Sequence, residues 1–382
     1  MKIVIYSSNT NAYEADSLRI FTFPSWKTQW QKICALHPEN EYVFVSQKPA
    51  FFMPEDCEIL APEVSVQDFA DYILSKKPDM AVACSFWVTP FDWLSVKDAL
   101  IAEKLRENEI ETVCHPLKSM LICFDKWQTH LFLSANGFNV AKAVYVHHDL
   151  YFCAGSVKGV LENPYKESVF AQIKKLNLPL VIKDTHGLSS YGMTVVNTYG
   201  EAFCYLNSKR NNSDRIVEEF ISGEQFGAEI RSYKGVHTVF PPFKFSVNQY
   251  GITSPKQSIK TGPVTDELYD IFGLESELKR LAGLLELDGP SQVDLVFDGK
   301  KWFIIEINPR LSGMSETYAA SSDFLFKNFL PVVNEKLPLM SKAELEKLCT
   351  RSDVKYVCQI EDLTARQERE KGYCEVVRVT GL

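Results

Sequence analysis

The sequence lacks the signals that mark several common classes of protein. No run of apolar residues approaches the roughly 20 that a membrane-spanning helix requires. The N-terminus, Met1 to Tyr6, starts directly on a β-rich run and shows no apolar stretch of signal-peptide length. No GxGxxG turn follows this run, so an NAD-binding domain is not supported. We therefore expect a cytoplasmic protein that does not associate with membranes.

Cysteine and basic residues are present, but they are not arranged for the chemistry they often serve. The ten cysteines are scattered from Cys34 to Cys374, without a CxxC pair and without the Cys/His spacing of a zinc site. This pattern is typical of reduced thiols in a cytoplasmic protein. The net charge is −8 and no basic block compensates it, which argues against a nucleic-acid partner. A GxSxG motif and a clear Cys–His pairing are also missing, so no covalent nucleophile is indicated.

The composition and the first third of the chain indicate a multidomain α/β protein. The 382 residues are 46% hydrophobic and 24% charged, which is ordinary for a globular chain with two or three domains. β-rich runs at 2–6, 41–46 and 80–84 alternate with helix-length stretches such as 66–76. This alternation favours an open parallel sheet, and the loops at its strand ends are suited to bind substrate.

The pattern changes from about residue 115. Asp125 and Lys126 open an amphipathic helix that runs to Ser134, and Asn136-Gly137 is typical of a helix C-terminal turn. Further strands are expected at 143–146, 178–183, 194–197 and 375–379, with a helix at 343–348.

The most informative segment is the apolar run 303–310. Because a strand alternates its faces, Glu306 and Asn308 are expected on one side. The opposite face is expected to carry Phe303, Ile305 and Ile307. A carboxylate in an apolar strand is costly unless it is paired, and a divalent metal removes that cost. Mg²⁺ binds such oxygens together with phosphate and water, so the run is a candidate nucleotide-phosphate site; the alternative is an edge hairpin with solvated acids.

A strand and turn before this run add a third oxygen ligand. The segment 291–297 reads as a strand, and 298–301 reads as a hairpin turn containing a glycine. If the loop is three residues long, Asp294 lies diagonal to Glu306 on the same face. Asp294, Glu306 and Asn308 would then converge.

Two other segments are suited to bind a nucleotide. Lys183 ends its strand where its ammonium can reach a phosphate, and the glycines and serine hydroxyls of the next loop suit a flap over phosphates. The loop residues concerned are Gly187, Ser189, Ser190 and Gly192. The segment 216–230 reads as strand, turn and strand, and backbone groups at such a connection are suited to read an adenine edge. The alternative for the glycine–serine loop is a flexible hairpin loop. The alternative for the segment 216–230 is a strand whose acidic side chains are simply exposed to solvent.

Taken in order, these motifs resemble the ATP-grasp superfamily. The matching elements are Asp125-Lys126, Lys183 with its glycine–serine loop, the segment 218–225, Asp294, and Glu306-Ile307-Asn308-Pro309-Arg310. The last element is most similar to the branch related to carbamoyl-phosphate synthetase and amino-acid ligases. The resemblance implies an α/β (α+β grasp) fold: a pre-grasp open parallel α/β domain, then an ATP-grasp domain that holds the nucleotide between two antiparallel sheets. The implied parts are the pre-grasp domain at 1–114, the ATP-grasp domain at 115–338 with a lid at about 140–217, and a C-terminal segment at 339–382 packed on the grasp core.

The resemblance also implies a role for each matching residue. Lys126 and Lys183 would bind the ATP phosphates, and Ser189, Ser190 and Gly192 would form the loop that covers them. Glu218 would bind the adenine amino group, and Glu219 and Ile221 would use their backbone groups in the hinge. Gln225 stands where the family usually has a Glu that binds the ribose. The implied ligands of Mg²⁺ (or Mn²⁺) are Asp294, Glu306 and Asn308. Arg310 matches a position that contacts the acyl phosphate or the substrate carboxylate, and Lys260 or Lys256 would add a phosphate contact. One departure is Asp184, which follows Lys183 where the family commonly has Pro.

The implied activity is that of a ligase that uses ATP to activate a carboxylate as an acyl phosphate for attack by an amine. We favour an amino acid or a similar small carboxylate as the substrate, with specificity from the loops at 7–9 and 85–89 and from Ser312 and Glu316. A biotin carboxylase is disfavoured, because Met314 stands where such relatives have Glu. The alternatives are a D-alanine–D-alanine-type ligase, a ligase for peptides or natural products, and a non-catalytic ATP-binding regulatory module. The expected partners are small-molecule substrates, and a homodimer is the default assembly.

Overall fold

A computed structural model of the chain describes most of the residues that carry these motifs. The described residues are 1–8, 30–31, 34–35, 37–47, 53–54, 56–85, 92–153, 160–187, 193–247, 258–261, 264, 273–312, 314–315, 354–358 and 374–378. Within these ranges, no helix combines the length and the apolar character needed to cross a bilayer.

The N-terminal part forms a five-stranded sheet, in which all pairs are parallel and the order is β3-β2-β1-β4-β5. Its strands are β1 (Lys2–Ser7), β2 (Glu41–Ser46), β3 (Glu58–Ile59), β4 (Met80–Ala83) and β5 (Glu111–Val113). It is accompanied by α3 (Val66–Ser75), the 3-10 helix η1 (Asp92–Ser95) and α4 (Val96–Glu107). Apolar side chains such as Val4, Phe69 and Ile101 form one buried cluster between strands and helices. The predicted open parallel sheet is confirmed.

A second, four-stranded sheet is antiparallel, with the order β6-β9-β7-β8. Its strands are β6 (Ala143–Val146), β7 (Leu180–Asp184), β8 (Thr194–Val196) and β9 (Arg215–Glu219). Its helices are α7 (His148–Phe152), α8 (Pro164–Ile173) and α9 (Tyr199–Leu206). They bury apolar side chains against one face, which contains Leu180, Ile182 and Val217. The side chains that alternate with these three, including Lys183, therefore point to the other face. We call these strands and helices the lid.

The third sheet, which we call the central sheet, is antiparallel with the order β15-β14-β10-β12-β13-β16-β17, and β11 also pairs with β10. Its strands are β10 (Glu224–Tyr233), β11 (Val236–Val239), β12 (Phe243–Phe245), β13 (Ser258–Thr261), β14 (Gly289–Phe297), β15 (Trp302–Asn308), β16 (Val354–Cys358) and β17 (Cys374–Arg378). The helices that bury apolar side chains against one face of this sheet are α5 (Leu117–Phe124), α6 (Lys126–Ala135) and α11 (Leu274–Leu284).

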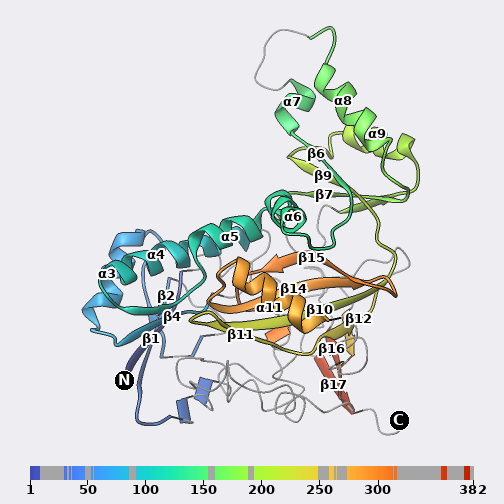
Figure 1. Ribbon diagram of the computed structural model, residues 1–382. Helices are drawn as coiled ribbons and strands as arrows, with labels where there is room; N and C mark the ends of the chain where they lie inside the picture. The colour runs from blue at the N-terminus through green and yellow to red at the C-terminus, as the bar shows by residue number, and fades with distance from the viewer. Residues whose placement is uncertain are drawn as a thin grey trace, which may run out of the picture.

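The arrangement of the three sheets matches the predicted fold class. In Figure 1 the parallel sheet lies on the left, the lid projects at the upper right, and α5 and α6 run along the upper side of the central sheet toward the lid. A parallel α/β unit followed by two antiparallel sheets is what the sequence predicted. The residue limits proposed for the domains stay predictions, and the helix expected at 343–348 lies outside the described residues.

The predicted strand–turn–strand at 216–230 is present, but its two strands belong to different sheets. β9 lies in the lid and β10 in the central sheet, and residues 220–223 join them. Gly223 is required in this link, because a Cβ atom there would lie 2.3 Å from the carbonyl oxygen of Phe297. The link therefore packs closely on the central sheet, and it is a covalent connection between the two sheets expected to hold the nucleotide.

Candidate functional site

Two rows of paired residues, polar except for Gly227, cross β10, β14 and β15. In the first row Gly227 pairs with Asp294, and Asp294 pairs with Glu306. The second row joins Glu229, Gln292 and Asn308 in the same way. Paired residues of an antiparallel sheet point to the same face. The residues that alternate with them on β14, namely Val293, Leu295 and Phe297, belong to the hydrophobic core. The two rows therefore lie on the face opposite the core, as the sequence predicted for Asp294, Glu306 and Asn308.

A β-bulge in this hairpin corrects two details of the prediction. Leu295 pairs with Ile304, whereas Asp294 pairs with Glu306, so Ile305 is an extra residue in β15. The side chains of Trp302, Ile304 and Ile307 are the ones in the core cluster. The prediction that Phe303 and Ile305 share the face of Ile307 was wrong, because the extra residue shifts the alternation by one. Asp294 lies directly opposite Glu306 rather than diagonal to it, and four residues, not three, separate the paired Phe297 and Trp302.

The two facing carboxylates have different electrostatic environments. Burial, and then the neighbouring charge of Glu306, raise the pKa of Asp294 to about 7, although a hydrogen bond from Gln292 opposes this. That bond joins Gln292 Nε2 to Asp294 Oδ1 over 2.6 Å. Burial also acts to raise the pKa of Glu306, but the charge and hydrogen bond of Lys126 outweigh it, and the pKa is lowered. Asp294 thus favours its protonated form while Glu306, next to the Lys126 ammonium, stays ionised.

Lys126 connects the central sheet with the loop that follows β7. Its helix α6 begins at Asp125, whose side chain accepts hydrogen bonds from the backbone N–H groups of Trp127 and Gln128. The Lys126 ammonium lies 2.8 Å from Glu306 Oε1 and donates to the carbonyl oxygen of Gly187 over 2.6 Å. The resemblance assigned this lysine to the ATP phosphates, and the structure holds it against the predicted metal ligand Glu306.

A second lysine–acid pair lies on the inner face of the lid. The Lys183 ammonium, on β7, lies 2.7 Å from Glu218 Oε1, on β9. The two side chains are only 10% and 14% exposed, so the pair is largely protected from water. These are the residues assigned to the phosphates and to the adenine amino group, and the structure brings them together.

Asn308 and Arg310 form a third polar contact at the end of β15. The Arg310 guanidinium donates from Nη2 to Asn308 Oδ1 over 2.9 Å and from Nη1 to the carbonyl oxygen of Leu311 over 3.2 Å. Both residues are about 5% exposed. Each predicted metal ligand therefore accepts a hydrogen bond or ion pair from this chain's own donor: Gln292 for Asp294, Lys126 for Glu306, and Arg310 for Asn308.

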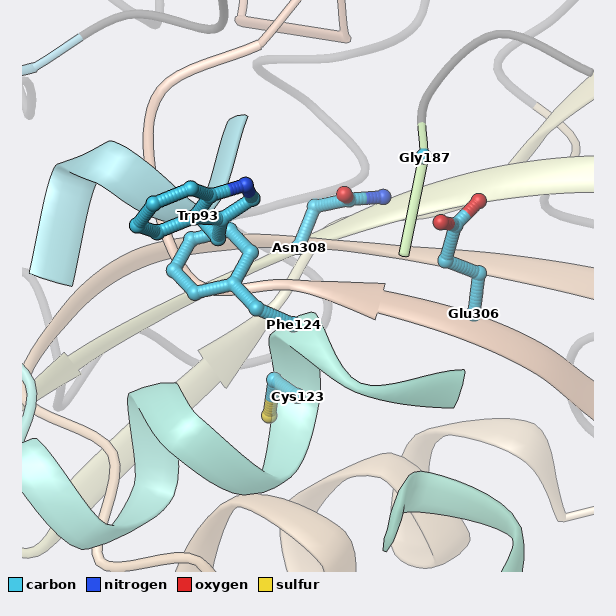
Figure 2. Close-up of a pocket in the computed structure, with 6 residues that line it drawn as sticks. All are labelled: Trp93, Cys123, Phe124, Gly187, Glu306 and Asn308. Atoms are coloured by element: carbon cyan, nitrogen blue, oxygen red, sulfur yellow. The ribbon is translucent and has the colours of Figure 1, made fainter. Parts of the chain in front are cut away.

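A pocket opens beside these ligands (Figure 2). It is lined by Trp93, Cys123, Phe124, Gly187, Glu306 and Asn308. The polar groups come from β15 and the apolar ones from η1 and the end of α5. Sequence reasoning did not single out Trp93 or Phe124, and instead placed specificity in the nearby loop at 85–89. Residues 86–89 of that loop lie outside the described residues, but Trp93 follows it closely in the chain.

The remaining predicted ATP residues have varied surroundings. The Glu219 carboxylate accepts hydrogen bonds from the backbone N–H and the side-chain amide of Asn177, and its own backbone N–H donates to the Lys142 carbonyl. The Glu219 N–H therefore already has a partner within the chain. Gln225 lies on β10 two residues before Gly227, and so on the same face as the polar rows. Ile221 is half-buried in the link between β9 and β10.

Lys260 lies on β13, farther across the central sheet. Its ammonium is 5.5 Å from the centre of the Phe245 ring, and its charge acts to lower the pKa of Asp294. Its charge therefore acts on the polar rows from a neighbouring part of the sheet. Ser189, Ser190, Gly192, Lys256 and Glu316 lie outside the described residues.

Asp184, the departure noted after Lys183, is held by the neighbouring strand. It pairs in register with Arg215 on β9, and their side chains form an ion pair. Ser213 Oγ also donates to Asp184 Oδ1 over 2.7 Å. These contacts fix the end of β7 from which the glycine–serine loop departs.

Comparison with known proteins defines the class to which this site belongs. The family model for the ATP-grasp domain matches residues 123–314, which is half of the chain. The matched range contains every residue predicted to bind ATP or the metal, together with Lys256, Lys260 and Arg310. The chain is therefore a member of the ATP-grasp family, as its motifs predicted.

Two curated proteins show similarity over parts of their length. The D-alanine–D-alanine ligase of Buchnera aphidicola subsp. Schizaphis graminum is 27% identical over 200 residues, covering 50% of this chain and 60% of that protein. The arginine-specific large chain of carbamoyl phosphate synthase from Bacillus subtilis is 22% identical over 150 residues, covering 38% of this chain and 14% of that one. In both cases the match spans less than two thirds of the relative.

Solved structures show a similar fold over most of the chain. The L-amino acid ligase from Bacillus licheniformis superposes with a TM-score of 0.59 at 16% identity, covering 93% of this chain and 78% of that one. The D-alanine–D-alanine ligase from Bacillus anthracis has a TM-score of 0.58 at 14% identity, covering 91% and 99%. The same ligase has been solved with ATP, with a TM-score of 0.55 to this chain. At these identities the likeness establishes the fold.

Proposed function

We propose that this protein is an ADP-forming carbon–nitrogen ligase that uses ATP to join a carboxylate, most suitably an amino acid, to an amine. The observation that carries the proposal is the facing pair Asp294 and Glu306 with the Lys126 ammonium on Glu306. Two acids and an ammonium group next to one another are suited to bind a metal and a triphosphate together. Membership of the ATP-grasp family, and relatives that are themselves ligases, support this choice.

The residues present fit a divalent cation. Asp294 and Glu306 are direct cross-strand partners, and burial together with the charge of Glu306 raises the pKa of Asp294. A divalent cation bound by both carboxylates would stabilise their ionised forms. No cluster of three or more His, Cys, Asp or Glu able to hold a metal exists among the described residues, so phosphate oxygens would complete the shell. Asp294, Glu306 and Asn308 would hold Mg²⁺ or Mn²⁺. When bound, the ion would neutralise the charge that develops on the transferred phosphoryl group.

The lysines and the hinge are proposed to bind ATP. Lys126 and Lys183 each lie against an acid, Glu306 and Glu218. Negatively charged phosphates would compete for these ammonium groups and leave both acids available for their own ligands. Glu218 lies on β9 next to the link at 220–223, where backbone groups suit an adenine edge.

Arg310 is proposed to orient the substrate. Its guanidinium lies at Asn308, beyond the metal ligands on β15, and its planar fork suits a carboxylate or an acyl phosphate. Lys260 and Lys183 would supply further positive charge near the phosphates, and both face polar groups of the site. A cleft with fixed cations stabilises developing negative charge without a side-chain nucleophile.

The proposed reaction has two steps. A carboxylate oxygen attacks the γ-phosphorus of ATP, the bond from that phosphorus to the oxygen bridging to the β-phosphate breaks, and ADP leaves. The amine nitrogen then attacks the acyl carbon, phosphate departs with the electron pair of the C–O bond, and the amine proton passes to that phosphate. Both steps depend on positioning, which this arrangement of fixed strands supplies.

The test is ADP release measured with ATP, Mg²⁺, and pairs of carboxylates and amines. The proposal requires release that depends on the carboxylate, and formation of the amide that depends on both substrates. Nucleotide binding without ADP release for every pair would instead favour a regulatory ATP-binding module.

A further inference from the structure

The two lysines assigned to the ATP phosphates lie on different parts of the molecule. Lys126 begins α6, which packs on the central sheet, whereas Lys183 lies on β7 of the lid. In Figure 1, α6 lies between the central sheet and the strands of the lid. A single triphosphate can contact both ammonium groups only when the lid is held at one distance and one angle from α6. The contacts that join the lid to α6 therefore determine whether the two lysines can act together.

One set of contacts holds the end of β7. The backbone N–H of Lys126 donates to the carbonyl oxygen of Thr185 over 2.8 Å, and its ammonium donates to the carbonyl oxygen of Gly187 over 2.6 Å. His186 Nε2 lies 3.6 Å from Asp125 Oδ2. These contacts involve residues 185–187, which directly follow β7. By themselves they would fix the lid at one point and leave it able to rotate.

A second set of contacts consists of aromatic rings stacked on Trp127. The rings of Trp127 and Tyr145 lie nearly parallel, with centroids 5.3 Å apart and planes at 18°. His130, on the same side of α6, has its ring centroid 5.1 Å from that of Trp127, with planes at 9°. Aromatic pairs at such separations attract one another beyond the effect of their burial. Trp127 therefore joins α6 to β6, which lies on the other side of β9 from β7.

Tyr145 lies on the face of the lid that carries Lys183. Tyr145 pairs in register with Ile216, and Ile216 pairs in register with Lys183. These three residues therefore form one row on the inner face of the lid. Val144 and Val146, which flank Tyr145 on β6, point into the core on the opposite face. The contact between Trp127 and Tyr145 thus lies at the end of the row that contains Lys183.

His130 extends the same contact toward the pair formed by Lys183 and Glu218. Burial lowers the pKa of His130, and the charges of Glu218 and Lys183 act on it in opposite directions. The side of α6 that carries Trp127 and His130 therefore faces the inner side of the lid. Because the lid is held both at the end of β7 and on β6, its angle to α6 is fixed as well as its distance.

We propose that Trp127 and Tyr145 are positioning residues, whose stacking sets the separation between Lys126 and Lys183 that one triphosphate requires. Trp127 is next to Lys126 in the chain, and Tyr145 shares a row with Lys183. Loss of either ring would release one lysine relative to the other. The inference rests on the proposed binding of ATP by these lysines, and it adds two residues that act on the nucleotide through them.

The experiment measures, by calorimetry with Mg²⁺ present, how tightly the full-length protein binds a non-hydrolysable ATP analogue and adenosine. Trp127→Leu removes both stacked contacts and keeps an apolar side chain, so the affinity for the analogue should fall by about tenfold. Adenosine has no phosphates for the lysines to bind, so its affinity should stay within about twofold. Trp127→Phe keeps an aromatic ring and should recover most of the loss.

Variants of the lid test the same contact from its other side. Tyr145→Leu should weaken binding of the analogue as much as Trp127→Leu does. The double variant should bind it about as tightly as either single variant, because all three lose the same contact. Tyr145→Phe keeps the ring and removes only the hydroxyl, which donates to Asp214, so its affinity should stay within about twofold of wild type. Leu131→Ala is the matched control, because Leu131 lies one turn after Trp127 on α6 and is 44% exposed.

The failures of this inference and of the proposed function look different. Unchanged affinity for the analogue in Trp127→Leu, an equal loss for analogue and adenosine in both leucine variants, or losses that add in the double variant would overturn the positioning role. If the wild-type protein shows the expected binding pattern but releases no ADP with any pair of substrates, the ligase function is refuted and the positioning role stands. If the wild-type protein does not bind the analogue, both are refuted.

Discussion

The ammonium of Lys126 lies 2.8 Å from the carboxylate of Glu306, joining the residue assigned to the ATP phosphates to a residue assigned to the metal. Lys183 and Glu218 repeat this relationship in the lid, at 2.7 Å. In each pair a positive and a negative group that would bind different parts of Mg·ATP neutralise one another. Nucleotide binding would therefore exchange these internal ion pairs for external ones, so that neither charge is left buried without a partner.

Lys126→Met should weaken ATP binding and strengthen the binding of free metal. The nucleotide loses a phosphate contact, which we expect to reduce affinity by about tenfold or more, as for other charge-assisted hydrogen bonds. Glu306 loses its internal cation at the same time, so Asp294 and Glu306 face each other without compensation and bind Mn²⁺ without nucleotide. Calorimetric titrations with ATP and with Mn²⁺ would measure both effects. If the wild-type protein bound Mn²⁺ without nucleotide as tightly as Lys126→Met does, the proposed exchange of ion pairs on nucleotide binding would be contradicted.

Glu306→Gln should reduce turnover by about two to three orders of magnitude, the usual effect of removing one strong electrostatic contact to a transition state. The amide keeps the shape of the side chain, so the melting temperature should change little by comparison. Steady-state ADP release is the measurement. Glu103→Gln, at an exposed position on α4, serves as the matched control and should retain full activity. Full activity of Glu306→Gln would show that Glu306 is not part of the active site.

His115 should make the protein sensitive to acid. Burial lowers the pKa of His115 to about 4, from an ordinary value of 6.5. Its Nδ1 accepts from the backbone N–H of Asp288 and its Nε2 faces the carbonyl of Pro290, so the neutral ring is satisfied and a second proton has no acceptor. The unfolded chain binds this proton first, so stability is fully present above pH 6.5 and falls as pH drops toward 4, by about 3 kcal/mol in total.

Two measurements check the role of His115. The imidazole resonances of His115 should not titrate above about pH 5. The free energy of unfolding of His115→Gln should depend less steeply on pH between 6.5 and 4 than that of the wild-type protein. Titration of this ring near pH 6.5 would show that the histidine is not held in its neutral form.

Asp184→Asn should destabilise the lid. The change removes the charge partner of Arg215, which is only 2% exposed, and leaves a buried guanidinium without its acid. Because Asp184 is itself 27% exposed, we expect a loss of about 2 kcal/mol, less than for a fully buried pair. Chemical denaturation is the measurement. Glu224→Gln, which breaks an ion pair with Lys244 whose partners are both nearly half-exposed, should cost less than about 1 kcal/mol.

Much of the fold could be predicted because local signals agreed with tertiary structure. Asp125 caps α6, Gly137 adopts the left-handed conformation that ends it, and β6 spans the predicted residues Ala143–Val146. In the site, the common face of Asp294, Glu306 and Asn308 was predicted from strand alternation and the hairpin turn.

Other features depend on contacts that sequence patterns do not contain. The bulge at Ile305 adds one residue without any glycine or proline to mark it, so simple alternation gave the wrong face for Phe303 and Ile305. The pairing of Lys126 with Glu306 was also not predicted, because the two residues lie far apart in the chain and no local sequence pattern links them. Trp93 was not predicted to line the pocket because it lies close to a strand more than 200 residues later in the chain.

The extra residue in β15 has a consequence for how this chain can change over evolution. Upstream of Ile305 the strand directs Trp302 and Ile304 into the core, and downstream it directs Glu306 and Asn308 away from it. Removal of a single codon here would turn the side chains of Glu306 and Asn308 toward the core and that of Ile307 away from it. The composition of the segment would hardly change. Selection should therefore act on the length of this strand as strictly as on the identity of the residues that it presents.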